Sequence, residues 1–134
     1  MYFINKELLI FIIMNNFRHQ KLLWLGINLF MVIAMVIIGG ITRLTDSGLS
    51  MTNWNLIGGI IPPLNENDWL NLFQTYKQYP EYNLKNFEMT LIEFKQIFFW
   101  EYFHRVWGRL VGLTFFIPLI YLWLKNAFSK SEKK

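Results

Sequence analysis

One uncharged run of 20 residues, LLWLGINLFMVIAMVIIGGI, extends from Leu22 to Ile41. A helix of about 20 apolar residues matches the hydrocarbon thickness of a bilayer, so this run predicts a transmembrane helix at 21–42. A secretory signal peptide is the alternative, but the run is longer than a signal core and no small-residue cleavage site follows it. The first constraint on this chain is therefore a membrane.

Composition points to the same environment. Apolar residues make up 54% of the 134 residues and aromatic residues 19%, which is high for a soluble domain of this size. The formal net charge of +4 comes from basic residues that are scattered or lie beside the apolar runs, so we expect a membrane surface as the partner and no nucleic acid. The sequence contains no cysteine, which excludes disulfides, thiolate metal sites and a cysteine nucleophile.

A second apolar run, 97–124, is interrupted near its start by charged residues. From Val106 to Leu124 only Arg109 is charged, so this segment also has the length and composition of a transmembrane helix. Pro118 lies inside it, which membrane helices tolerate. We therefore predict an all-α membrane protein in which two transmembrane helices are joined by a long outer loop with short helices.

The distribution of charge predicts an orientation. The N-terminal segment 1–20 and the tail 125–134 are basic, whereas the stretch from Thr42 to Gln96 carries four basic and six acidic residues. Positively charged flanks stay on the cytoplasmic side of a membrane. We expect both termini in the cytoplasm or matrix, and the connecting segment 43–96 outside, in the periplasm or intermembrane space.

The outer segment is too long for a turn and contains glycine and proline breakers. Within 67–79, large apolar side chains recur at helical spacing, at Trp69, Leu72, Phe73 and Tyr76. This spacing predicts a short amphipathic helix capped by Asn67 or Asp68. Residues 88–102 have helical character that leads directly into the second span. Five aromatic residues of the segment are typical of a membrane interface: Trp54, Trp69, Tyr76, Tyr79 and Tyr82.

The stretch WEYFHRVWGR, residues 100–109, places charged groups at the start of the second span. Five residues share one helical face at spacings of three and four: Glu101, His104, Arg105, Gly108 and Gly112. The two glycines leave room on this face for a ring-shaped ligand whose metal His104 would bind. Arg105 and Arg109 could hold the ligand's carboxylates. Charges this close to the hydrocarbon are costly and usually mark function.

A structural interpretation of the same residues stays open. Gly108 and Gly112 form a GxxxG pattern, which more often serves close helix packing. Arg105 and Arg109 could anchor the helix at the interface through their long side chains, and Glu101 could simply pair with Arg105 across one turn. His104 taken alone would more often be a hydrogen-bonded interfacial residue.

Four motifs follow one another along the chain: GGITRLTDSGLS (39–50), Trp54 followed by GGIIPP (58–63), YPEYN (79–83), and EFKQIFFWEYFHRVWGRLVG (93–112). In their order, spacing and membrane placement they resemble the N-terminal part of the haem A synthase family, of the bacterial and mitochondrial type. The resemblance covers residues 21–125.

The resemblance implies an enzyme that oxidises the methyl group of haem O to the formyl group of haem A, by successive hydroxylations, for cytochrome oxidase assembly. Members of this family have eight transmembrane helices in two four-helix halves, each with a pair of histidines at a haem site. The N-terminal half is associated with the substrate haem and the C-terminal half with a haem b cofactor. The implied location is the bacterial plasma membrane or the mitochondrial inner membrane.

Carried over onto this sequence, the resemblance makes His104 the expected axial ligand of the haem iron and Glu101 the expected catalytic carboxylate, with Arg105 near the haem propionates. A neutral imidazole is a good ligand for iron, and a carboxylate can move protons. Gly108 and Arg109 complete the expected cofactor-binding set. For Arg43 and Asp46 two roles are open, helix termination with loop docking on one side and ligand contact on the other.

Ligation of the iron by two histidines needs a second histidine besides His104. The other histidine of the chain is His19, at the opposite end of the first helix, roughly 30 Å away. We therefore expect the missing helices to come from another chain or a homo-oligomer, together with an electron donor that the sequence does not identify. Two alternatives remain: a non-catalytic haem-binding membrane subunit that pairs two copies of His104, and an inactive truncated remnant.

Overall fold

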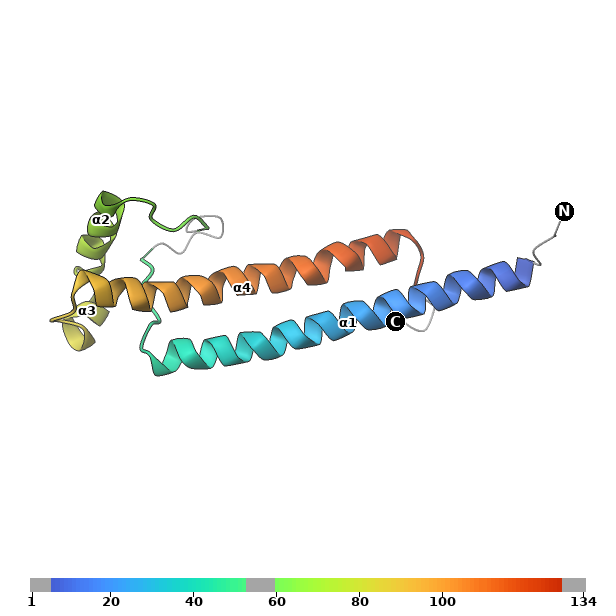
Figure 1. Cartoon of the computed structure of the whole chain (residues 1–134), viewed down its shortest axis with the longest axis horizontal. Helices are drawn as coiled ribbons and strands as arrows, with labels where there is room; N and C mark the ends of the chain where they lie inside the picture. Colours follow the sequence, from blue (N-terminus) through green and yellow to red (C-terminus); the bar gives the residue numbers. More distant parts are fainter. Residues whose placement is uncertain (1–5, 53–59, 129–134) are drawn as a thin grey trace. The chain divides into compact units, whose positions relative to one another are not determined.

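The computed structural model describes residues 6–52 and 60–128, with side chains described from residue 15 onward. The described residues form four helices and no strand: α1 (Lys6–Leu44), α2 (Glu66–Tyr76), α3 (Pro80–Lys85) and α4 (Leu91–Leu124) (Figure 1). The prediction of an all-helical chain is confirmed. Trp54 and the glycine pair at 58–59, which belong to the second motif, lie outside the described residues.

The two long helices, α1 and α4, are the candidate membrane spans. The segments Asn15–Leu44 and Leu91–Leu124 both have the length and composition to cross a bilayer. Helix α1 begins well before the predicted span at 21–42. Helix α4 continues from the outer segment through Pro118 to its end, as the helical character of 88–102 predicts. The positions of the membrane boundaries and the orientation of the termini stay predictions.

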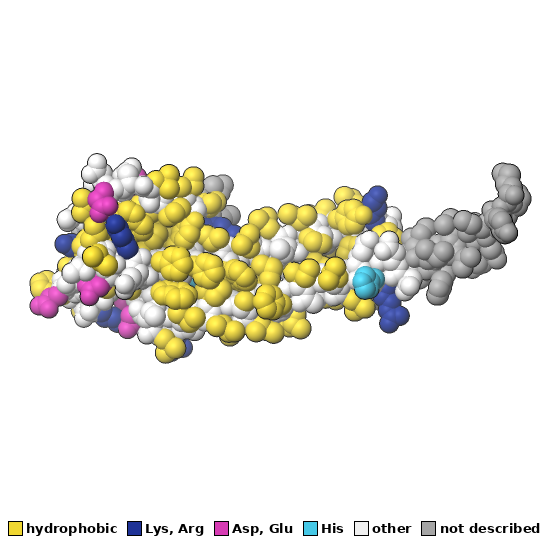
Figure 2. Space-filling model, in the orientation of Figure 1, with side chains coloured by type: hydrophobic (Ala, Val, Ile, Leu, Met, Phe, Trp, Pro, Cys, Tyr) yellow, Lys and Arg dark blue, Asp and Glu magenta, His cyan; other side chains and the backbone are white. Residues whose placement is uncertain are grey.

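The chain divides into two compact units by its internal contacts. Unit 1 contains residues 1–33 and 110–134, and unit 2 contains residues 34–109. The described part of unit 1 is therefore a pair of helical segments, whereas unit 2 also contains the outer segment with α2 and α3. Figure 2 shows hydrophobic side chains over much of the visible surface of the long helices, with acidic side chains gathered over residues of unit 2.

Unit 1 is held by a few polar side chains that donate to backbone carbonyls. The indole nitrogen of Trp24 donates to the Thr114 carbonyl at 3.0 Å, and Lys21 Nζ donates to the Ala127 carbonyl at 3.2 Å. Asn28 Nδ2 donates to the Trp24 carbonyl at 2.8 Å. Polar groups inside an apolar segment need such internal partners, because no water reaches them in a bilayer.

Unit 2 is built around an aromatic core. Its buried members are Met51, Phe73, Tyr76, Tyr82, Phe94 and Phe98. The ring centroids of Phe73 and Tyr76 each lie 5.0 Å from that of Phe94, so α2 packs on the first turns of α4. Contacts at this distance add to the burial of the rings themselves. This core fixes the outer segment against the helix that carries the charged cluster.

Two of the aromatic residues expected at a membrane interface are buried within unit 2, and the position of the whole set relative to a membrane stays a prediction. Tyr76 and Tyr82 are buried in the aromatic core, and Trp69 packs against it. Tyr79 is exposed, and Trp54 lies outside the described residues. The helical spacing within α2 and the short helix α3 bring the rings of Tyr76 and Tyr82 into contact with each other, with Phe73 and with Phe94.

The start of α2 also differs from the prediction. Its N-cap is Asn65, whose side chain accepts a hydrogen bond from the Asp68 backbone N–H at 2.8 Å. The prediction of Asn67 or Asp68 as the cap is wrong. With Asn65 as the cap, Glu66 and Asp68 fall in the first turn, where negative charge is favourable. Pro80, expected only as a breaker, occupies the first turn of α3, where its missing N–H costs nothing.

Helix α1 ends in a Schellman motif. The backbone N–H of Asp46 donates to the Arg43 carbonyl at 3.3 Å, and that of Ser47 donates to the Thr42 carbonyl at 3.0 Å. Asp46 adopts the left-handed conformation that this motif requires, with φ 48°. Because backbone groups satisfy these carbonyls, the side chain of Arg43 is not needed to terminate the helix.

Candidate functional site

A cavity of about 620 Å³ lies in unit 2 and brings together residues from α1, the following loop, α3 and α4. Its volume is in the usual range for small-molecule sites, about 300 to 1,000 Å³. The lining residues are Gly39, Thr42, Arg43, Asp46, Gly48, Leu49, Glu81, Lys85, Glu101, His104 and Arg105. Three of the predicted site residues, the last three of this set, therefore meet in one cavity.

Glu101 is buried, with 5% of its surface exposed, and its carboxylate accepts hydrogen bonds from three donors. Oε2 accepts hydrogen bonds from Ser50 Oγ at 2.7 Å and from the Met51 backbone N–H at 2.8 Å. Arg105 pairs with Oε1 across one turn of α4, as the spacing predicts. A buried carboxylate is tolerated only with such partners. Through its hydrogen bonds with Ser50 and Met51, Glu101 links the loop that follows α1 to α4.

His104 lies against Gly39 of α1. A Cβ atom built on Gly39 would stand 3.2 Å from His104 Nε2, closer than side chains normally pack. Gly39 therefore leaves the room that the imidazole needs beside the cavity. This contact was not predicted from the sequence. The only signal for it is the pair Gly39-Gly40 at the end of an otherwise apolar run, since a glycine in a helix interior often marks a close approach.

Gly108 and Arg109 do not line this cavity. A Cβ on Gly108 would lie 3.2 Å from Met35 Cε, so Gly108 accommodates a side chain of α1. That contact fits the packing interpretation of the glycine pattern. Gly112 has no atom within 4 Å of a built Cβ. A ligand-binding role for Gly108 and Arg109 stays a prediction.

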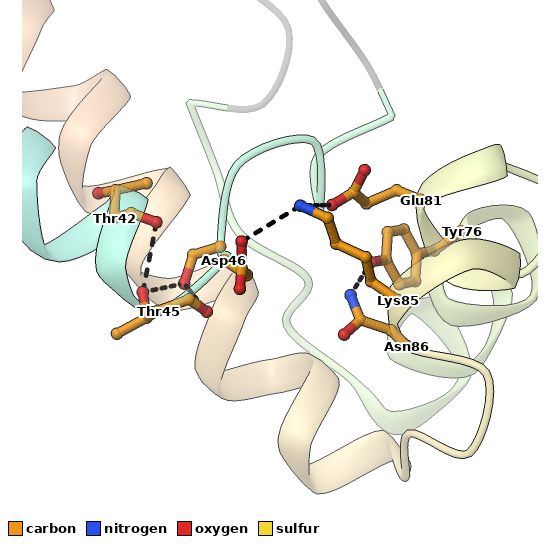
Figure 3. Close-up of polar contacts among 8 residues, drawn as sticks. Thr42, Thr45, Asp46, Tyr76, Glu81, Lys85 and Asn86 are labelled. Carbon is orange, nitrogen blue, oxygen red and sulfur yellow. Dashed lines mark hydrogen bonds and ion pairs between the residues drawn. The ribbon is translucent and has the colours of Figure 1, made fainter.

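The edge of the cavity carries an ion-pair network that was not predicted. Lys85 Nζ lies 3.2 Å from Asp46 Oδ1 and 3.2 Å from Glu81 Oε1, which links α3 to the end of α1 (Figure 3). Hydrogen bonds to Glu81 and Asp46 raise the pKa of Lys85. Asp46 thus has the structural role considered for it, as the left-handed residue of the helix end and a partner of α3.

The pKa of Tyr76, which lies beside this network, is also raised. Burial raises the pKa of Tyr76, while a hydrogen bond from Asn86 Nδ2 to its hydroxyl, at 2.7 Å, acts in the opposite direction. Figure 3 shows the two side chains next to Lys85 and Glu81. The packing of the aromatic core and the ion pairs at the cavity edge are therefore adjacent in unit 2.

The donor set fits a haem better than a bare metal ion. Among the described residues, no three His, Asp or Glu side chains are grouped so that they could hold a metal ion. A haem iron takes only axial ligands from protein, so one imidazole can serve. The cavity offers that imidazole in His104, with basic side chains beside it. In chemical terms this is an all-helical protein with two candidate membrane spans and a cavity suited to a tetrapyrrole.

The chain belongs to the COX15-CtaA family, described as "Cytochrome oxidase assembly protein", whose sequence model matches residues 22–134. It is 52% identical over 108 residues to the "Heme A synthase" of Nitrosospira multiformis and 52% identical over 109 residues to that of Rickettsia canadensis. It is 48% identical over 110 residues to the human "Heme A synthase COX15". No solved structure matches the chain significantly.

These relatives are longer than the chain. The matched segments cover 81%, 81% and 82% of this chain but only 30%, 32% and 27% of the three relatives, respectively. The chain thus corresponds to less than a third of each of them. Family membership, together with two helices long enough to span, identifies a membrane protein.

Proposed function

We propose that this chain forms the substrate-haem part of a haem A synthase, which oxidises the methyl group of haem O to the formyl group of haem A for cytochrome oxidase assembly. Family membership and the names of the relatives support this activity. The observation that carries it is the convergence of Glu101, His104 and Arg105 on one cavity. The names of the relatives favour this activity over the non-catalytic and remnant alternatives.

In this proposal the bound haem supplies the iron and the methyl group that is oxidised. His104 would bind the haem iron, and the absence of a side chain at Gly39 leaves room for its imidazole. Glu101 exchanges protons at its carboxylate. A carboxylate has about four acceptor positions, and Ser50, Met51 and Arg105 occupy three of them. One position is left for a ligand group or a water molecule in the cavity.

The second axial ligand and the haem b cofactor belong, in this proposal, to helices outside the 134 residues. His19 is not among the residues that line the cavity. The partners that follow are a membrane, further helices of the same enzyme or a second copy, and an electron donor. We propose the bacterial plasma membrane or the mitochondrial inner membrane as the location, with both termini on the cytoplasmic or matrix side, from the basic flanks.

A chimaera tests the activity directly. Residues 22–128 replace the matching segment of the Nitrosospira multiformis relative, in cells that lack their own haem A synthase, and extracted haems are separated by chromatography. We expect haem A from the chimaera. Glu101→Gln keeps the size of the side chain but removes the proton-accepting carboxylate, so we expect haem O to accumulate while haem binding persists. His104→Ala should lower haem binding itself.

A matched variant separates these roles from general damage. Glu88→Gln changes an exposed glutamate of the same transferred segment and should leave the haem A yield unchanged. Normal haem A formation by the Glu101→Gln chimaera would remove Glu101 from the chemistry. Normal haem content and haem A yield in the His104→Ala chimaera would remove the proposed ligand and, with it, the site.

A further inference from the structure

The cavity contains three basic side chains, and two of them are already paired. Arg105 pairs with Glu101, and Lys85 lies between Asp46 and Glu81. Arg43 is the third. Within the part of the chain that the structure describes, no ion pair or hydrogen bond engages the Arg43 side chain. The lining as a whole carries three basic and three acidic side chains, and Arg43 is the basic one that no ion pair engages among the described residues.

The position of Arg43 relates it to the proposed iron ligand. Arg43 follows Gly39 by four residues on α1, so the two lie on one helical face, about 6 Å apart along the axis. Gly39 is the residue against which His104 packs. A flat ligand attached to His104 and lying in the cavity would thus extend along the face on which Arg43 stands.

The helix end leaves the guanidinium available. A basic residue in the last turn of a helix often serves its free carbonyls, but here the N–H groups of Asp46 and Ser47 occupy the carbonyls of Arg43 and Thr42. The neighbouring carboxylate of Asp46 is in turn paired with Lys85. Lys85 thus shares its positive charge between the carboxylates of Asp46 and Glu81, so both carboxylates are paired with Lys85 and not with Arg43.

We propose that Arg43 binds a propionate carboxylate of the tetrapyrrole and so fixes which edge of the ring faces the loop end of α1. This assignment rests on the proposed haem site. The sequence resemblance placed Arg105 near the propionates, but the structure pairs Arg105 with Glu101. Arg43 is therefore proposed as a further anchor for a propionate. Arginine suits the role because its guanidinium makes two parallel hydrogen bonds to a carboxylate. With its carboxylate edge at Arg43, the opposite edge of the ring is turned away from the loop end of α1.

The test compares two ligands that differ only in the carboxylates. The full 134-residue chain in detergent micelles is titrated with iron protoporphyrin IX and with its dimethyl ester, and binding is followed by absorbance. We expect the unmodified chain to prefer the free acid. Arg43→Gln should weaken binding of the free acid about tenfold, as expected for a lost charge-assisted hydrogen bond, and leave the ester unchanged. Arg43→Lys should lose less.

Arg18→Gln is the matched control, since Arg18 is an exposed arginine of the same helix that does not line the cavity. Equal loss for both ligands in Arg43→Gln, or no loss for the free acid, overturns the assignment while leaving the haem site intact. Failure of the unmodified chain to bind either porphyrin, or full binding by His104→Ala, overturns the proposed site and the Arg43 assignment with it.

Discussion

The two units of the chain are stabilised by different means. Unit 2 surrounds an aromatic core and buries a carboxylate with three hydrogen-bond donors. Unit 1 exposes most of its large apolar side chains and has a few hydrogen bonds from side chains to backbone carbonyls. An apolar surface of that kind is stable in lipid or against other helices. The difference teaches that the proposed site depends on packing internal to unit 2, whereas unit 1 depends on its surroundings.

Truncating one buried side chain in each unit should expose this difference most strongly. Phe94→Ala removes the centre of the aromatic core, and we expect a loss of about 4 kcal/mol in the free energy of unfolding. Leu122 is equally buried in unit 1, but Leu122→Ala should lose less than half as much, because lipid or detergent solvates the exposed apolar atoms. Denaturant titration in micelles, followed by near-ultraviolet circular dichroism, measures both. Equal losses would contradict the comparison.

Buried hydroxyls within unit 2 sharpen the same point. Ser50→Ala removes the hydroxyl that donates to Glu101, so we expect a loss of about 2 kcal/mol, the range for hydrogen bonds to charged groups. Ser47 is just as buried, but among the described residues its hydroxyl forms hydrogen bonds with the hydroxyl and carbonyl of Thr45 alone. Ser47→Ala should therefore cost about 1 kcal/mol. The same titration compares them, and the reverse order would show that Ser50 does not support the carboxylate.

The corresponding polar substitution in unit 1 should have a smaller effect. Asn28→Leu replaces a buried amide, which donates to the carbonyls of Trp24 and Thr114, by an apolar side chain of similar size. Interhelical hydrogen bonds in membranes contribute about 0.6 kcal/mol on average, and we expect a change no larger than this in thermal unfolding. A loss comparable to that of Ser50→Ala would mean that unit 1 also depends on its internal polar contacts.

The smallest expected effect is a pH dependence confined to unit 2. The pKa values of Tyr76 and Lys85 are raised from ordinary values of 10.0 and 10.5. For both groups the folded state favours the protonated form, so their stabilisation is complete below pH 10.0 and is lost as the pH rises through the raised pKa values. Unfolding of the unmodified chain should become easier above that pH.

Two substitutions test which residue causes the loss of folding stability at alkaline pH. Tyr76→Phe should remove the part that comes from the buried phenol, and Lys85→Met the part that comes from the ion pairs with Glu81 and Asp46. Unfolding by denaturant is measured on both sides of pH 10.0 for each variant. An alkaline loss that is unchanged in the double variant would place its origin elsewhere in the chain.

The sequence predicted the features that depend on neighbours along the chain. Two long apolar helices, the amphipathic helix that became α2 and the pairing of Glu101 with Arg105 follow from length and from spacings of three and four residues. The family motifs pointed to His104, which the structure places in the cavity. The predicted N-cap of α2 was wrong because Asn65, Asn67 and Asp68 all have side chains that favour the N-cap position. Only the packing of the helix selects Asn65 among them.

The remaining parts of the site depend on contacts between distant residues, which periodicity does not reveal. Ser50 reaches Glu101, Lys85 reaches Asp46, and Gly39 faces His104. The first two contacts join positions 51 and 39 residues apart. Likewise, the sequence did not predict that the rings of Tyr76 and Tyr82 are buried in the aromatic core, because their aromatic partners lie on other helices.

The hydrogen bonds between Glu101 and the loop after α1 also have a consequence for biogenesis. The carboxylate that holds Ser50 and Met51 is made about fifty residues later in synthesis, so the loop has no anchor while the ribosome is still completing the outer segment. Chains fold from the N-terminus as they emerge, but here the loop after α1 forms its hydrogen bonds to Glu101 only when α4 is present. At the proposed site, haem would therefore be loaded only after α4 has been synthesised, which would order insertion before cofactor delivery.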